Sequence, residues 1–199
     1  ILSQDVTAPE QYENLTIGDR GPAGGLVFYD KGVYSDGWRY MEAAPRHTEW
    51  LNMQWGAFGF TVGGTSDGIG DGDANTEHIV DMIDTFGFGD DYAAKVCHDL
   101  VAGGYDDWFL PSSSELFHMN MNLDNHNASL GDFVNDPVYQ DDRYWSSTEV
   151  DPLCAVMVDF GEDYFVNTMP QAAKDGSYEI YVFPATFDVD PHVRAARMF

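Results

Sequence analysis

The acidic, glycine-rich segment 67–73 has the residue types best suited to binding a metal ion. It reads Asp-Gly-Ile-Gly-Asp-Gly-Asp, and hard cations such as calcium take several carboxylate and carbonyl oxygens from flexible loops. Asp67, Asp71 and Asp73 are therefore candidate calcium ligands. The segment is not an EF-hand, because counting from Asp71 places Thr76 where the motif needs glycine and Met82 where it needs glutamate. The alternative is a solvated loop that precedes a helix.

The common signatures of catalysis do not occur in the sequence. It contains neither a Gly-x-Ser-x-Gly nucleophile elbow nor a His-Glu-x-x-His zinc helix. The glycine run 21–25 precedes a β-rich segment and opens no helix, so it predicts a turn and not a phosphate cradle. Because the chain has 34 acidic residues, carboxylate pairs at glycosidase spacing arise by chance and carry no signal. We therefore predict a protein that is not an enzyme, with a carboxylate-based hydrolase as the least favoured alternative.

The charge balance excludes several kinds of partner. Among 199 residues, 34 are Asp or Glu and only 9 are Lys or Arg, which gives a formal net charge of -25. Binding to nucleic acid or to anionic lipid needs clustered cations, so neither partner is expected. The longest apolar run, 180–187, is too short to cross a membrane. Such a chain suits an extracellular, cell-surface or virion protein, with a saline environment as one explanation of the charge.

The two cysteines are too few for a disulfide framework or a four-thiolate zinc site. Cys97 lies in a helical pattern beside Val96 and Leu100, which favours a small buried thiol. A single disulfide between Cys97 and Cys154 remains the alternative.

Strands are predicted at both ends of the chain and helices in the middle. A hairpin pairs 25–29 with 38–43, and Trp38, Trp108 and Trp145 are expected in the core. The C-terminal third alternates in the manner of strands, at 144–147, 155–160, 164–169, 178–183 and 193–198.

Three helices are predicted between these strands. Asn75 or Thr76 caps the first, and the second runs over 92–102 and stops at a glycine pair. Ser112 and Glu115 have the spacing of a capping box, which starts a short third helix. The order of strands, helices and strands predicts an α+β domain over 17–199, preceded by a lead-in or stem at 1–16. The first hairpin and the last strand are expected to share one sheet.

Five segments occur in the order found in a known bacterial, viral and archaeal family. They are IGDRGPAGG (17–25), GWRYMEAAP (37–45), GGYDDWFLPS (103–112), YWSSTE (144–149) and VRAARMF (193–199). The chain resembles the family named for the C-terminal domain of a collagen-like adhesin. This resemblance implies a C-type lectin fold of the formylglycine-generating-enzyme subtype. It has short antiparallel sheets, two main helices plus a short third, and adjacent N- and C-terminal strands.

The resemblance also implies a function. Many relatives are variable proteins of diversity-generating retroelements, in which the segment between the Trp-Ser-Ser block and the final block is hypermutated to vary a ligand-binding face. The corresponding region here is about 145–199, with an insertion at 177–190. The implied ligand-contacting residues are Val150, Asp151, Leu153, Cys154, Val156, Val158, Glu162, Asp163, Tyr164, Val166 and Asn167.

The expected function is therefore recognition of a protein or glycan receptor on a host or neighbouring cell, without a cofactor. A carbohydrate-binding adhesin domain is the alternative. The valines at 156, 158 and 166 also fit a role in lining the core. Enzymes that share the implied fold bind copper with a close pair of cysteines. The two cysteines of this chain are too far apart in the sequence to match that pair.

Overall fold

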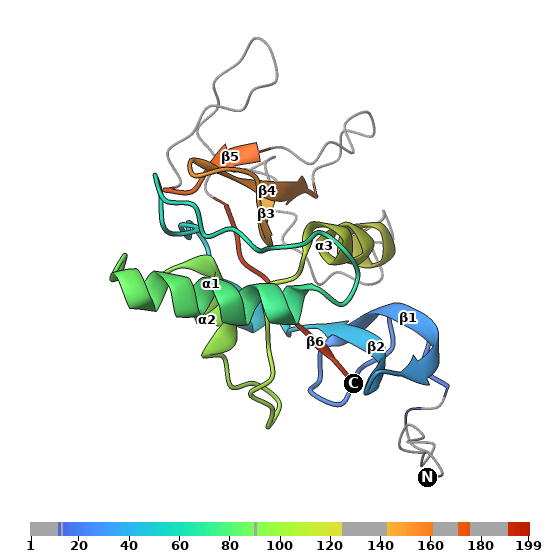
Figure 1. Ribbon diagram of the computed structural model, residues 1–199. Coiled ribbons are helices and arrows are strands. Elements are labelled where there is room, and N and C mark those ends of the chain that lie inside the picture. Colours follow the sequence, from blue (N-terminus) through green and yellow to red (C-terminus); the bar gives the residue numbers. More distant parts are fainter. Residues whose placement is uncertain (1–11, 13, 90, 125–142, 161–170, 176–190) are drawn as a thin grey trace.

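Two small antiparallel sheets and three α-helices build the described part of the chain (Figure 1). The structure is a computed structural model that describes residues 12, 14–89, 91–124, 143–160, 171–175 and 191–199. The predicted α+β class is confirmed. No helix in these ranges combines the length and the apolar character that a membrane span requires.

The first sheet joins the two ends of the domain. It contains β1 (Leu26–Ser35), β2 (Trp38–Ala43) and β6 (Ala196–Met198) in the order β1-β2-β6. The predicted hairpin is confirmed, and its turn places Asp36 and Gly37 at φ of 55° and 89°, the left-handed pair typical of a two-residue hairpin loop. The last strand shares this sheet as predicted. It pairs with β2, however, so β1 and β6 are separated by one strand and are not direct neighbours.

The second sheet carries the predicted ligand-contacting segment. Its strands are β3 (Arg143–Glu149), β4 (Cys154–Asp159) and β5 (Gln171–Ala173), in the order β3-β4-β5. β3 and β4 confirm the strands predicted at 144–147 and 155–160. The strands predicted at 164–169 and 178–183 and the insertion at 177–190 lie outside the described residues, as does most of the stem.

The helices lie between β2 and β3 in the sequence. They are α1 (Gly72–Phe86), α2 (Ala93–His98) and α3 (Ser113–Met119), with short helical turns η2 (Arg46–Thr48) and η3 (Asn120–Asp124). The capping box predicted for α3 is present, with Ser112 and Glu115 each bonded to the other's backbone. α2 ends at His98 and is shorter than predicted.

The predicted start of α1 is wrong. The helix begins at Gly72, and Asn75 and Thr76 lie buried within its first turns. The Asn75 side chain donates to the carbonyl of Ser66 over 2.7 Å, so its polar atoms serve tertiary contacts instead of a cap. A side chain at Gly72 would meet a carboxylate oxygen of Glu115 at 2.2 Å, which explains the glycine there.

The core forms two clusters. The larger packs one face of α1, with Ile79 and Ile83, against the fully buried Trp55 and Trp145. Trp108 and Trp145 are buried as predicted, whereas Trp38 is only partly buried. The smaller cluster packs β1, β2, α3 and β4 together through Phe28, Met41, Leu116 and Val158.

Both cysteines are free thiols. Cys97 is fully buried in the larger cluster, as the helical pattern predicts, and burial raises its thiol pKa well above the usual value. Cys154 is partly exposed, and burial followed by the nearby Asp151 carboxylate raises its pKa. Neither thiol is activated as a nucleophile.

A buried carboxylate joins α3 to the start of α1. Glu115 is fully buried and accepts hydrogen bonds from the backbone N–H of Ser112 and of Gly70, both over 2.7 Å. Burial raises the pKa of Glu115 from 4.5 to about 7, against the opposing effect of these hydrogen bonds.

This raised pKa predicts a pH-dependent stability. Between pH 4.5 and 7 the unfolded chain releases the Glu115 proton while the folded chain retains it, so the free energy of unfolding falls as the pH rises. The fall, taken relative to Glu115→Gln, should reach about 3 kcal/mol and stop above pH 7. Urea unfolding of both proteins across this range measures it. A constant difference between the two curves would contradict the prediction.

Candidate ligand-binding surface

The turn between β3 and β4 presents two apolar side chains to solvent. Val150 is 39% exposed and Leu153 is 49% exposed. The turn is closed by the Asp151 carboxylate, which accepts from the backbone N–H of Leu153 over 2.7 Å and of Cys154 over 2.8 Å. The backbone is thus held by local bonds, and the two apolar side chains are left free to make contacts.

The residues implied by the family resemblance fall into three groups. Val150, Asp151 and Leu153 are exposed in the turn, and Cys154 beside them is partly exposed. Val156 and Val158 are buried in β4, in agreement with the alternative that they line the core. The remaining five lie outside the described residues: Glu162, Asp163, Tyr164, Val166 and Asn167.

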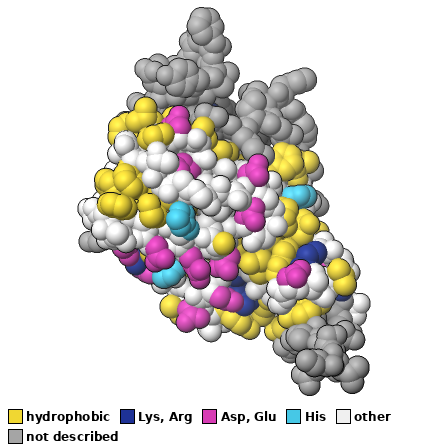
Figure 2. Space-filling view, in the orientation of Figure 1, with side chains coloured by type: hydrophobic (Ala, Val, Ile, Leu, Met, Phe, Trp, Pro, Cys, Tyr) yellow, Lys and Arg dark blue, Asp and Glu magenta, His cyan; other side chains and the backbone are white. Residues whose placement is uncertain are grey.

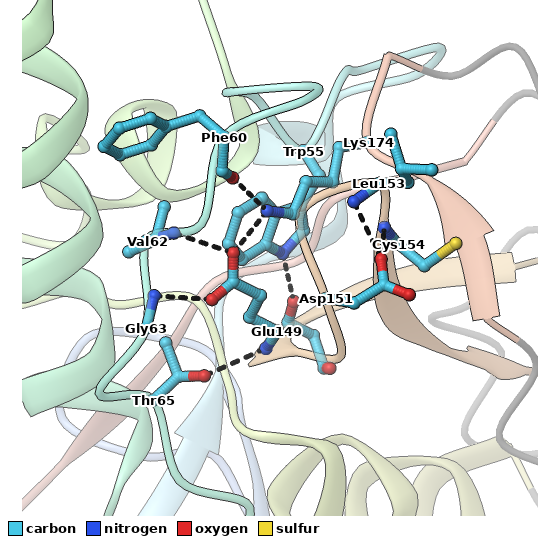
Figure 3. A network of polar contacts seen from close by, with 11 residues as sticks. Trp55, Phe60, Val62, Gly63, Thr65, Glu149, Asp151, Leu153, Cys154 and Lys174 are labelled. Atoms are coloured by element: carbon cyan, nitrogen blue, oxygen red, sulfur yellow. Dashed lines mark hydrogen bonds and ion pairs between the residues drawn. The ribbon is translucent and has the colours of Figure 1, made fainter.

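A buried ion pair ties this sheet to a long loop (Figure 3). Glu149 at the end of β3 pairs with Lys174, which follows β5, and their side chains are only 5% and 0% exposed. The Lys174 ammonium also donates to the carbonyl of Phe60 over 3.0 Å and lies 4.6 Å from the centre of the Trp55 ring.

The Glu149 carboxylate fixes the loop from the other side. It accepts from the backbone N–H of Val62 over 2.8 Å and of Gly63 over 2.5 Å. The Glu149 backbone N–H in turn donates to the Thr65 hydroxyl over 3.0 Å. Loop residues 60–65 are therefore attached to the second sheet by the charged pair, which bonds Phe60, Val62 and Gly63, and by a separate bond at Thr65.

Two Phe-Gly-Phe segments meet where this loop passes the end of α1. Phe60 of the first segment lies 4.8 Å from Phe86 and 4.9 Å from Phe88 of the second, measured between ring centres. The second segment is turned by Gly87, whose φ of 71° ends α1 in the left-handed conformation. Phe86 is 56% exposed and Phe88 is 45% exposed.

The first Phe-Gly-Phe segment also lies against the β3–β4 turn. The backbone N–H of Gly59, between Phe58 and Phe60, donates to the carbonyl of Pro152 over 2.9 Å. Figure 2 shows hydrophobic side chains gathered on the left of the view, over the carboxyl-terminal end of α1. We call this set the phenylalanine surface; its exposed members are Phe58, Phe86, Phe88, Val150 and Leu153.

The phenylalanine surface has acidic neighbours. Asp84 and Asp91 flank the second Phe-Gly-Phe segment in the chain, and both are exposed. Asp151 lies between Val150 and Leu153 in the turn. The apolar centre is thus bordered by negative charge.

Sequence reasoning missed the phenylalanines and the ion pair. The repeated Phe-Gly-Phe, at 58–60 and 86–88, was the available signal. The pairing of Glu149 with Lys174 left no local signal, because the two residues come together only through the pairing of three strands.

The acidic segment 67–73 is organised by its own hydrogen bonds. The Asp71 carboxylate accepts from the backbone N–H of Gly68 over 2.8 Å, and the Asp67 carbonyl accepts from the N–H of Ser114 over 3.2 Å. Within the described ranges, no three His, Cys, Asp or Glu side chains are grouped so that they could hold a metal ion. Asp67, Asp71 and Asp73 are thus not brought together as a ligand set.

No model of a known protein family matches the chain, and no curated protein matches it. The function therefore has to be argued from the residues and contacts described above.

The ion pair predicts a specific pattern of stability loss. Lys174→Met leaves the Glu149 carboxylate buried without its cation, so the free energy of unfolding should fall by about 3–5 kcal/mol. The double variant Glu149→Gln/Lys174→Met should lose less than the two single losses combined, because the pair acts as a unit. Urea unfolding gives all four values.

Lys95→Met is the control for an ordinary ion pair. Lys95 pairs with Asp84 and Asp99, whose side chains are 47% and 55% exposed, so its loss should cost about 1 kcal/mol or less. A Lys174→Met effect no larger than that of Lys95→Met would show that the buried pair does not hold the loop.

Proposed function

We propose that this domain is a non-enzymatic binding module that recognises a receptor through the phenylalanine surface. The observation that carries the proposal is the exposure of Phe58, Phe86, Phe88 and Leu153, at 45–56% each, on segments that contact one another. Large apolar side chains that gather in the open mark interaction sites in soluble proteins. Aromatic anchors of this kind supply much of the binding energy at protein interfaces.

The scaffold suits a surface whose side chains vary. The Asp151 carboxylate and the Glu149–Lys174 pair hold the backbone, so Val150 and Leu153 can be replaced without a buried contact being lost. This separation of backbone support from exposed side chains supports the proposal that the segment from about 145 to 199 is diversified by a retroelement.

The charge indicates the kind of receptor. The acidic neighbours of the phenylalanine surface and the net charge of -25 favour a protein whose contact surface is apolar at the centre and cationic at the rim. Opposite charge accelerates association at low salt and loses this effect as salt screens it.

Receptor recognition predicts binding that depends on the phenylalanine surface. On an array of extracellular proteins, the domain should bind a cationic protein saturably, and Phe88→Ser/Leu153→Ser should weaken that binding at least about tenfold, because two anchors are removed. Added salt should slow association. The control Val33→Ser/Leu51→Ser removes exposed apolar side chains that are not part of the phenylalanine surface and should bind as the parent does.

Other outcomes would favour the other candidate functions. Saturable binding to a defined sugar on a glycan array would support a carbohydrate-binding adhesin. Hydrolase activity that disappears on a single Asp or Glu substitution would contradict a binding module altogether.

Retroelement diversification is tested in the neighbouring DNA. We expect a reverse transcriptase gene and a near-copy of the segment that encodes residues 145–199, differing from it at adenines. If neither sequence lies nearby, the retroelement proposal is wrong. Receptor recognition by the phenylalanine surface is tested separately, by the binding experiment.

A further inference from the structure

Two arginines have no acidic partner among the described residues, in a protein that has few cations. Every other lysine and arginine forms an ion pair with a carboxylate. Arg20 and Arg46 are both exposed, and no acidic side chain in the described part of the chain pairs with either. With 34 acidic residues available, this lack of partners is notable.

Both arginines line the same open hollow. It lies at the open end of the first hairpin, where the chain enters β1 and leaves β2, and His47 also lines it. The walls between the basic groups are apolar and small, with Ala23 and Pro45 among them. The hollow therefore combines positive charge with apolar contact area, which is the usual composition of a site for a small organic ligand.

The turn that carries Arg20 is fixed from beneath by a buried carboxylate. Glu42 is fully buried and accepts from the backbone N–H of Ala23 and of Gly25, both over 3.1 Å. Arg197 donates to Glu42 over 2.9 Å and to Asp107 over 2.7 Å. The charge of Glu42 is therefore neutralised by Arg197. This network holds the backbone of the hollow in place, and the Arg20 side chain takes no part in it.

Close backbone packing fixes the opposite wall. A side chain at Gly103 would meet the carbonyl oxygen of Ala23 at 2.1 Å, so only glycine allows the two segments to approach. The Arg20 guanidinium donates to the carbonyl of Gly24 over 2.8 Å, which holds it at the rim while its other N–H groups remain available. On the Arg46 side, η2 is closed by the Thr48 hydroxyl, which donates to the carbonyl of Pro45 over 2.7 Å.

The geometry points to a binding site for a small organic monocarboxylate, with Arg20 and Arg46 as its charge partners. Guanidinium groups bind carboxylates through paired, charge-assisted hydrogen bonds. The apolar walls require a carboxylate on a compact apolar body. A polyanion is disfavoured, because the net charge of -25 repels each additional negative group. This site shares no residue with the phenylalanine surface. An experiment that contradicts one of the two proposals therefore leaves the other unaffected.

Titration of the 199-residue chain with benzoate at low salt tests the site. Benzoate should shift the backbone amide NMR signals of Ala23, Gly24, Ala102 and Gly103 saturably. Benzamide, its neutral analogue, should not shift them. Arg20→Gln and Arg46→Gln should each weaken benzoate binding about tenfold, since each removes one charge-assisted contact.

Lys31→Gln is the control for a general effect of charge. It removes one positive charge near the closed end of the same hairpin and should leave benzoate binding within about twofold of the parent. The Arg46 side chain makes no hydrogen bond or ion pair with the described residues, so Arg46→Gln should fold normally even if Arg20→Gln does not. The proposal is overturned if benzamide binds as well as benzoate, if Arg46→Gln binds like the parent, or if Lys31→Gln weakens binding as much as the arginine variants do.

Discussion

The buried ion pair between Glu149 and Lys174 is the contact on which the phenylalanine surface depends. It joins the end of β3 to the residue after β5, and the same two side chains reach the backbone of the loop at Phe60, Val62 and Gly63. Burial removes water from both charged groups. Hydrogen bonds to the loop backbone and the contact of the Lys174 ammonium with the Trp55 ring compensate for this loss. Without it, the loop would lose its bonds at Phe60, Val62 and Gly63 and would keep those at Gly59 and Thr65.

The same use of scarce cations recurs elsewhere in the protein. Arg197 joins Glu42 to Asp107, and Arg194 joins Glu49 to the carbonyl of Ala44. Each of these arginines is almost fully buried and connects segments far apart in the sequence. In a chain with a net charge of -25, several of the few positive groups thus act as internal connectors, which sets apart Arg20 and Arg46, exposed and without an acidic partner among the residues that the structure describes.

The sequence predicts features that local chemistry determines. The hairpin, the capping box at Ser112 and the buried Cys97 follow from turn residues, spacing and periodicity, and they are confirmed. The predicted start of α1 is wrong because the Asn75 side chain bonds to Ser66 instead of capping the helix. The residues next to Asn75 in the sequence do not indicate this tertiary contact. The candidate site was found only at the β3–β4 turn, since the phenylalanines beside it come from distant segments and meet through the ion pair.

Amide hydrogen exchange at Val62 and Gly63 tests the central claim most directly. Both N–H groups donate to the Glu149 carboxylate, so they should exchange slowly in the parent protein. In Lys174→Met, their exchange should accelerate, while the amides of β1 and β2 should keep their protection. Equal exchange at these two positions in both proteins would show that the ion pair does not hold the loop, and would remove the physical basis of the phenylalanine surface.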